Sequence, residues 1–227
     1  MAKTKTNLTV DEWMRRLEAD PEFARRKAER EKELQEREAQ SRAAEKPLLD
    51  DLARVGVNVQ TVWDLVNTSS PYRIALPVLL DHLQRRYPDG VREGIARALA
   101  IRPTRPIGWR ILVEEFNKTD AAEERVKDGL AVALAGASDN TVLEELIDLA
   151  KDKRHGSSRV LLLLGIERSR QPIAKEALVE LAKDPQLEKE IGSWRKRRDR
   201  SVKKHKPVSR STSLFCKFKG LFRKWLR

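Results

Sequence analysis

The pattern of apolar and polar residues divides the chain into a polar first part, an apolar middle and a polar end. Between residues 72 and 194, large apolar residues recur every three or four positions, which is the spacing of one face of an amphipathic α-helix. β-Branched residues form no alternating runs of the kind that strands need. We therefore predict an all-α protein built from short helices.

The middle of the chain also repeats itself. The segment Val91–Ala100, with the sequence VREGIARALA, returns as Val126–Ala135, with the sequence VKDGLAVALA. A second motif, two aliphatic residues followed by an acid, precedes each of these segments and occurs twice more. Its four copies start at Leu79, Leu112, Leu146 and Leu178. A period of roughly 33 residues with two helical segments is typical of helix-turn-helix repeats, which stack to bury a shared core. We expect about four helical hairpins between residues 72 and 194.

These repeats resemble a known family. The segment Asp89–Arg92, followed by Ile95 and Ala98–Leu99, resembles the second half of the short HEAT repeat of phycobilisome-lyase-like proteins, and Val126–Leu134 matches it again. The resemblance implies a short HEAT-like α-solenoid, a fold that serves scaffolds, adaptors, lyase subunits and some DNA repair enzymes. We expect the second helix of each repeat to line a binding groove. Its candidate residues are Glu93, Arg97, Asp128 and Arg159.

Residues 1–46 are predicted to form a charged helical arm. A capping-box pattern at Thr9 and Glu12 starts one helix, and Asp20-Pro21 starts the next. Only Phe23 and Leu34 are large apolar residues between positions 22 and 46, so no heptad seam exists and we expect a monomer. A solvated helix and a partner-binding arm both fit this pattern. We expect Pro47 to end the arm and residues 47–71 to form a pair of capping helices, Leu48–Val55 and Val59–Val66.

The positive charge is concentrated at the end of the chain. The sequence holds 47 Lys and Arg against 35 Asp and Glu, a net charge of +12. Residues 195–227 hold 14 of the bases and a single acid, so the remainder is nearly neutral. The body therefore does not carry the basic balance that a nucleic-acid-binding surface needs.

The basic end divides into a flexible linker, residues 195–213, and a basic amphipathic helix, residues 214–227. On a helical wheel the apolar residues form one stripe opposite the basic ones, which suits an anionic membrane surface. Docking onto a protein, including this protein's own groove, and nucleic-acid binding stay open as alternatives. The apolar set is Leu214, Phe215, Phe218, Leu221, Phe222 and Trp225, and the basic set includes Lys217, Lys219, Arg223 and Lys224.

The sequence offers no chemistry that would support catalysis. The three histidines fall in a helix, a turn and the tail without ligand spacing, and we expect them at the surface. Cys216 has no positioned base, and no glycine-rich phosphate loop occurs. We expect no metal and no cofactor. Trp63 and Trp109 are predicted to pack in the core, and Trp13 and Trp194 to cover the ends of the repeats.

No signal peptide or membrane-spanning run is evident in the sequence. We therefore expect a cytoplasmic protein, peripheral at the inner face of the membrane. The function predicted is a non-catalytic adaptor or scaffold that binds an unknown protein partner, with its tail on an anionic membrane. The alternative is a nucleic-acid-associated repeat protein that uses its basic tail.

Overall fold

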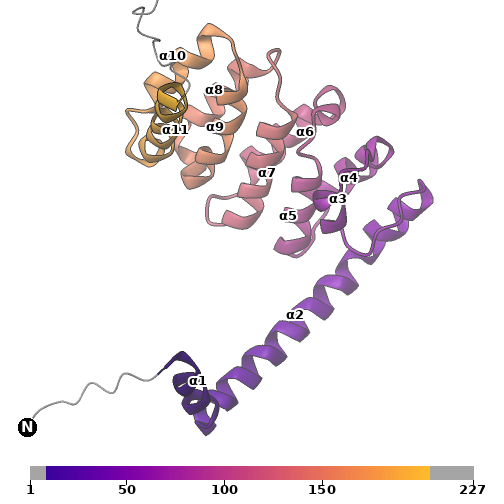
Figure 1. Cartoon of the computed structure of the whole chain (residues 1–227). Coiled ribbons are helices and arrows are strands. Elements are labelled where there is room, and N and C mark those ends of the chain that lie inside the picture. Colours follow the sequence, from indigo (N-terminus) through magenta and orange to yellow (C-terminus); the bar gives the residue numbers. More distant parts are fainter. Residues whose placement is uncertain (1–8, 205–227) are drawn as a thin grey trace, which may run out of the picture. The chain divides into compact units, whose positions relative to one another are not determined.

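The structure is a computed structural model in which residues 9–204 are described (Figure 1). These residues form helices and connecting segments, with no strand among them, which confirms the all-α prediction. The α-helices are α1 (Val10–Glu18), α2 (Pro21–Arg54), α3 (Trp63–Asn67), α4 (Leu76–Leu83), α5 (Asp89–Ala98), α6 (Arg105–Lys118), α7 (Glu124–Ala137), α8 (Leu143–Lys151), α9 (Arg159–Arg168), α10 (Pro172–Leu181) and α11 (Pro185–Lys204). Three 3-10 helices join them: η1 (Arg73–Ala75), η2 (Arg102–Thr104) and η3 (Lys153–Ser158).

The chain divides into two compact units, Met1–Leu181 and Ala182–Arg227. Within the first unit, neighbouring helices pair as α4 with α5, α6 with α7, and α8 with α9. The second helices of these pairs also pack on one another, α5 against α7 and α7 against α9. α7 therefore lies at the centre of the unit, with helices of three pairs around it.

The repeated sequence positions explain this close stacking. Leu99 and Leu134 hold the same place in the repeat, and both are fully buried, as their pattern predicts. Gly136 of α7 lies so close to the backbone of Ala100 that a Cβ atom there would overlap its carbonyl group. Gly129 faces the backbone of Glu93 in the same way, with a built Cβ 3.1 Å from the carbonyl oxygen. Small residues on α7 thus let two helix backbones approach each other.

The predicted boundary at Pro47 is wrong, because α2 continues through this residue to Arg54. A proline inside a helix lacks one backbone donor, which normally breaks the helix. Here Leu48 and Leu52 are fully buried in the part of α2 that contacts α4 and α5. Their burial holds the last turns in helical form and offsets the missing hydrogen bond.

α3 is also shorter than the predicted helix from Val59 to Val66, since it begins at Trp63. The carboxylate of Asp64 accepts hydrogen bonds from the backbone N–H groups of Gln60 and Thr61, at 2.8 and 3.0 Å. These bonds fix the preceding residues in a turn. The polar side chain competes locally with helix formation, as Asp often does at helix starts.

The second unit corrects the predicted linker. α11 runs to Lys204, so residues 195–204 are helical. Lys and Arg are good helix formers, and no breaker interrupts the sequence before Pro207. Residues 205–227, including the predicted amphipathic helix from 214 to 227, lie outside the described residues. Across residues 9–204, every helix is too short or too polar to cross a membrane.

Candidate protein-binding site

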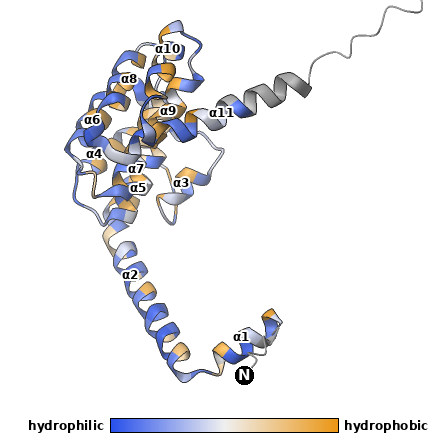
Figure 2. Cartoon of the chain, turned by 90° about the vertical axis from the view of Figure 1, so that its left-hand side faces the viewer, coloured by the Kyte–Doolittle hydropathy of each residue, from blue (hydrophilic) through white to orange (hydrophobic). Residues whose placement is uncertain are grey.

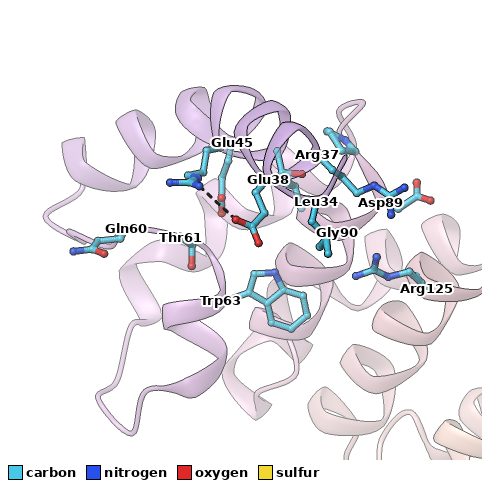
Figure 3. Close-up of a pocket in the computed structure, with 14 residues that line it drawn as sticks. Leu34, Arg37, Glu38, Glu45, Gln60, Thr61, Trp63, Asp89, Gly90 and Arg125 are labelled. Carbon is cyan, nitrogen blue, oxygen red and sulfur yellow. Dashed lines mark ion pairs between the residues drawn. The ribbon is translucent and has the colours of Figure 1, made fainter. Parts of the chain in front are cut away.

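A cavity of about 930 Å³ lies between the middle of α2 and the starts of α3 and α5. We call it the notch. Figure 3 shows side chains from α2 on one side of it and Trp63 on the other. The residues on which the argument below depends are Leu34, Glu38 and Ser41 from α2, and Trp63, Gly90 and Arg125 from the opposite wall.

Trp63 forms the apolar floor of the notch. On its inner side it packs against Gly94 of α5, where a Cβ atom would lie 3.1 Å from the indole Nε1 and 2.5 Å from a Val62 methyl. The absence of a side chain at this position lets the indole approach α5 closely. On its outer side the ring faces Leu34 and Glu38 (Figure 3). Trp63 therefore packs against α5 on its inner side, is only partly buried, and lines the cavity.

Glu45 ties the two walls together at the inner end of the notch. Its carboxylate is 4% exposed and accepts a hydrogen bond from the backbone N–H of Val62 at 2.5 Å. Burial raises the pKa of Glu45, while the hydrogen bond from Val62 acts in the opposite direction. Because this contact spans α2 and the approach to α3, it holds the notch at a defined width.

The rim of the notch carries both acidic and basic side chains. Arg42 pairs with Glu38 at 3.5 Å, and Arg125 pairs with Glu93 at 3.1 Å. Since the acids and bases are balanced and Leu34 and Trp63 lie between them, the notch suits an apolar side chain flanked by charged ones. No cluster of His, Cys, Asp or Glu among the described residues could hold a metal ion.

The sequence did not single out the notch. Its walls come from parts of the chain far apart in sequence, and the mixed charges of α2 resemble an ordinary solvated face. One signal was present: Leu34 is an isolated large apolar residue in a charged helix, and it is 51% exposed. An isolated exposed leucine needs no explanation by itself. Leu34 becomes a candidate contact residue because it lies opposite Trp63 across the notch.

All four predicted groove residues form polar contacts within the repeats, and Arg97 also lines a separate cavity. Glu93 is 8% exposed and pairs with Arg97 at 2.9 Å and with Arg125 of α7. The carboxylate of Asp128 accepts a hydrogen bond from the Ser158 hydroxyl at 2.6 Å. The contacts of Glu93 with Arg125 and of Asp128 with Ser158 join neighbouring helical pairs, so these polar groups are satisfied across an interface. Glu93 does not line an open groove.

Arg159, the fourth predicted groove residue, is 1% exposed and cannot contact a partner. Its guanidinium donates to the carbonyl oxygens of Ala150, at 3.3 Å, and Gly156, at 3.0 Å. Lys127 holds the equivalent place in the preceding pair and donates to the carbonyl oxygens of Phe116, at 2.7 Å, and Thr119. Both cations thus satisfy carbonyl groups at or beyond the end of the first helix of their pair, where the helix dipole favours positive charge.

The expectation of surface histidines is wrong for His82 and His155, which are both buried. His82 hydrogen-bonds through Nε2 to Asp51 at 2.9 Å and through Nδ1 to the Tyr87 hydroxyl at 2.6 Å. The bond to His82 is the main cause of the lowered pKa of Asp51. The His155 ring lies 4.3 Å from that of Phe116, and neither of its nitrogens has a hydrogen-bond partner. Burial lowers the pKa of His155.

The tryptophans follow their predictions in part. Trp109 is 7% exposed and donates through Nε1 to Glu145 at 2.5 Å, which confirms its packing role. Trp63 is half-buried and belongs to the notch. Trp13 is 54% exposed. It does not cover an end of the repeats, because α2 is the one helix among those described on which α1 packs substantially. Trp194 lies in the second unit, on α11.

No family model, curated protein or solved structure matches this chain. The resemblance to HEAT repeats therefore stays a prediction, and the notch has no counterpart from which a role could be carried over.

Proposed function

We propose that this protein is a non-catalytic adaptor of the HEAT-repeat, α-solenoid type that binds a protein partner. The packing of α5 on α7 and of α7 on α9 supports the solenoid interpretation, because it repeats one helical pair along one direction. Buried polar groups such as Glu93, Lys127 and Arg159 form ion pairs or hydrogen bonds that hold the helices of these pairs together.

The observation that carries the proposal is the notch. It combines an aromatic floor, a lone leucine and balanced charges, and it is large enough for side chains of a partner helix. Trp63 needs no rearrangement to receive them, since Gly94 supports its inner face. A preorganised aromatic residue in a cleft is the usual anchor of a protein–protein contact.

The second part of the proposal concerns location. The basic amphipathic segment from 214 to 227 attaches the adaptor to the anionic, cytoplasmic face of a membrane. This step is based on the sequence pattern. Electrostatic attraction contributes about 1 kcal/mol for each Lys or Arg near the surface, and the buried apolar stripe adds to it.

The notch is tested by filling it. Ser41 is partly buried and lines the cavity, whereas its neighbour Gln40 is exposed and does not. We expect Ser41→Arg to abolish crosslinking of the full chain to its partner in cells and Gln40→Arg to preserve it. Both variants should unfold at the temperature of the parent. The same crosslinked proteins in all three samples would contradict the notch as the binding site.

The location is tested with lipid vesicles. The parent should co-sediment with vesicles that contain anionic lipid and much less with neutral ones. Replacing Phe218 and Trp225 by Ser keeps every charge but removes apolar anchors, so binding should be lost. Nucleic-acid binding through phosphates would fall steeply with salt and would not respond to these two changes. Such a result would favour the alternative function.

A further inference from the structure

The helix α1 exposes an apolar face that no other described part of the first unit covers fully. Val10 is 77% exposed, Trp13 is 54% exposed and Met14 is 43% exposed, and Leu17 is partly buried. These residues are spaced three or four apart, so they form one stripe along the helix. Several large apolar residues side by side, one of them Trp, are typical of an interaction surface.

α2 places this stripe at a fixed distance from the notch. α1 joins α2 near Pro21, and the notch is lined by α2 residues from Leu34 to Glu45. With a rise of 1.5 Å per residue, the centre of the notch lies about 27 Å along α2 from this junction. Two α2 helices that run antiparallel with Arg30 near a twofold axis would bring each α1 to the notch of the other copy.

The charges of α2 favour the same arrangement. On the two sides of Arg30, residues 22–28 contain three bases and one acid, and residues 32–38 contain two bases and three acids. An antiparallel pair places the basic segment of one copy beside the acidic segment of the other, at both ends of the contact. A parallel pair would place like charges together.

We propose that the notch binds α1 of a second copy of this chain, so that two molecules associate reciprocally through their α1–α2 arms. Trp13 and Met14 of each copy fill the space between Leu34 and Trp63 of the other. The proposal rests on the proposed function in one respect, that the notch binds a protein segment, and it names that segment. It replaces the expectation of a monomer, which considered a continuous heptad seam only.

The test uses two variants of the full chain, alone and mixed. Trp13→Ser removes the inserted side chain, and Ser41→Arg blocks the receiving notch. In sedimentation velocity the parent should have the mass of two chains, and each variant alone should have the mass of one. In an equimolar mixture the intact Trp13 of one variant meets the intact notch of the other. The mixture should therefore regain dimers through one of the two contacts.

A covalent test gives the orientation. Arg30 lies four residues before Leu34, on the same face of α2, whereas Lys32 faces away. With Cys216 replaced by Ser, Arg30→Cys should form a disulfide-linked dimer under mild oxidation, because the two residues meet near the axis. Lys32→Cys should form far less.

The outcomes separate this inference from the function on which it rests. A monomeric parent would overturn the second copy as the occupant. If Ser41→Arg still removed crosslinks to another protein, the notch would remain a binding site and the proposed function would stand. Loss of vesicle binding in Trp13→Ser, with a monomeric parent, would assign the α1 stripe to a membrane instead. Dimers that persist unchanged in both single variants would overturn the reciprocal contact.

Discussion

α7 and the first part of α2 are both regular helices, yet different forces hold them. Nine of the fourteen residues of α7 are buried. In α2, the buried residues are Glu45, Leu48 and Leu52, all near its end. The preceding turns are mostly hydrophilic (Figure 2) and have exposed ion pairs four residues apart, such as Arg26–Glu22 at 3.9 Å and Arg42–Glu38 at 3.5 Å. Such pairs stabilise a helix by about 0.3–0.5 kcal/mol each, far less than burial does.

This difference separates the two tasks that we propose for the molecule. α7 is fixed by its neighbours and holds the repeats together. The exposed part of α2 is not buried by the repeats. Its surface is therefore available to a partner, and substitutions there have little effect on the stability of the fold. The notch lies where the exposed part of α2, which carries Leu34, meets the buried part, which carries Glu45.

The largest expected difference between the two regions is in stability, and a leucine-to-alanine substitution made in each region tests it. Leu134→Ala in α7 removes a fully buried side chain, and we expect it to lower the free energy of unfolding by about 2–5 kcal/mol. Leu34→Ala in α2 removes a side chain that is 51% exposed and should change it by less than about 0.5 kcal/mol. Urea denaturation of both variants measures this, at a protein concentration low enough that association of the arms does not contribute. Equal midpoints would mean that α7 is not central.

A second substitution pair concerns backbone approach. Gly136→Ala would force a methyl group into the backbone of Ala100, and we expect it to cost about 1–3 kcal/mol. Gly192 of α11 has no atom within 4 Å of a built Cβ. Gly192→Ala should therefore raise stability, by roughly 0.5–1 kcal/mol, through helix propensity. Thermal unfolding compares the two. A tolerated alanine at position 136 would contradict the close stacking of α5 and α7.

A third prediction uses the pH dependence that buried groups confer on the repeats. The pKa of His155 lies below its usual 6.5 in the folded state, because burial disfavours its charged form. As the pH falls below 6.5, the unfolded chain binds a proton that the folded chain does not, so stability falls. His155→Phe removes this loss and keeps the contact with Phe116. We expect equal or higher stability at pH 7 and a smaller decrease between pH 7 and 5.

The control for that prediction is the difference between parent and variant, since other groups titrate too. The pKa of Asp152 is lowered to about 2, mainly by its hydrogen bond with Arg154, so its contribution is lost only at much lower pH. Equal pH dependence in the parent and His155→Phe would show that the pKa of His155 is the same in the folded and unfolded states, which would contradict its burial.

The same contrast explains what the sequence could predict. Matched positions such as Leu99 and Leu134 were predictable, because apolar spacing records which face of a helix is buried. The start of α2 at Asp20 was predictable too, since the carboxylate caps the helix locally at 3.0 Å. The continuation of α2 past Pro47 was not, because it depends on leucines that pack against later helices. His155 was missed for the same reason: its aromatic neighbour is thirty-nine residues away in sequence.

The smallest effect is expected from the charges of the arm. The Arg25–Glu29 pair spans 3.9 Å and both side chains are more than half exposed, so Glu29→Gln should change the free energy of unfolding by less than about 0.5 kcal/mol. Glu93→Gln is the matched substitution in the repeats. It weakens the pairs with both Arg97 and Arg125 at a carboxylate that is 8% exposed, and we expect it to cost about 1–3 kcal/mol. Salt should reduce the effect of Glu29→Gln and leave most of the effect of Glu93→Gln, because water and ions screen exposed charges far better than buried ones.

The two substitutions are compared by urea denaturation at low protein concentration, where association of the arms does not contribute. Equal costs at the two positions would mean that the exposed part of α2 packs as firmly as α5, and the division between arm and repeats would fail.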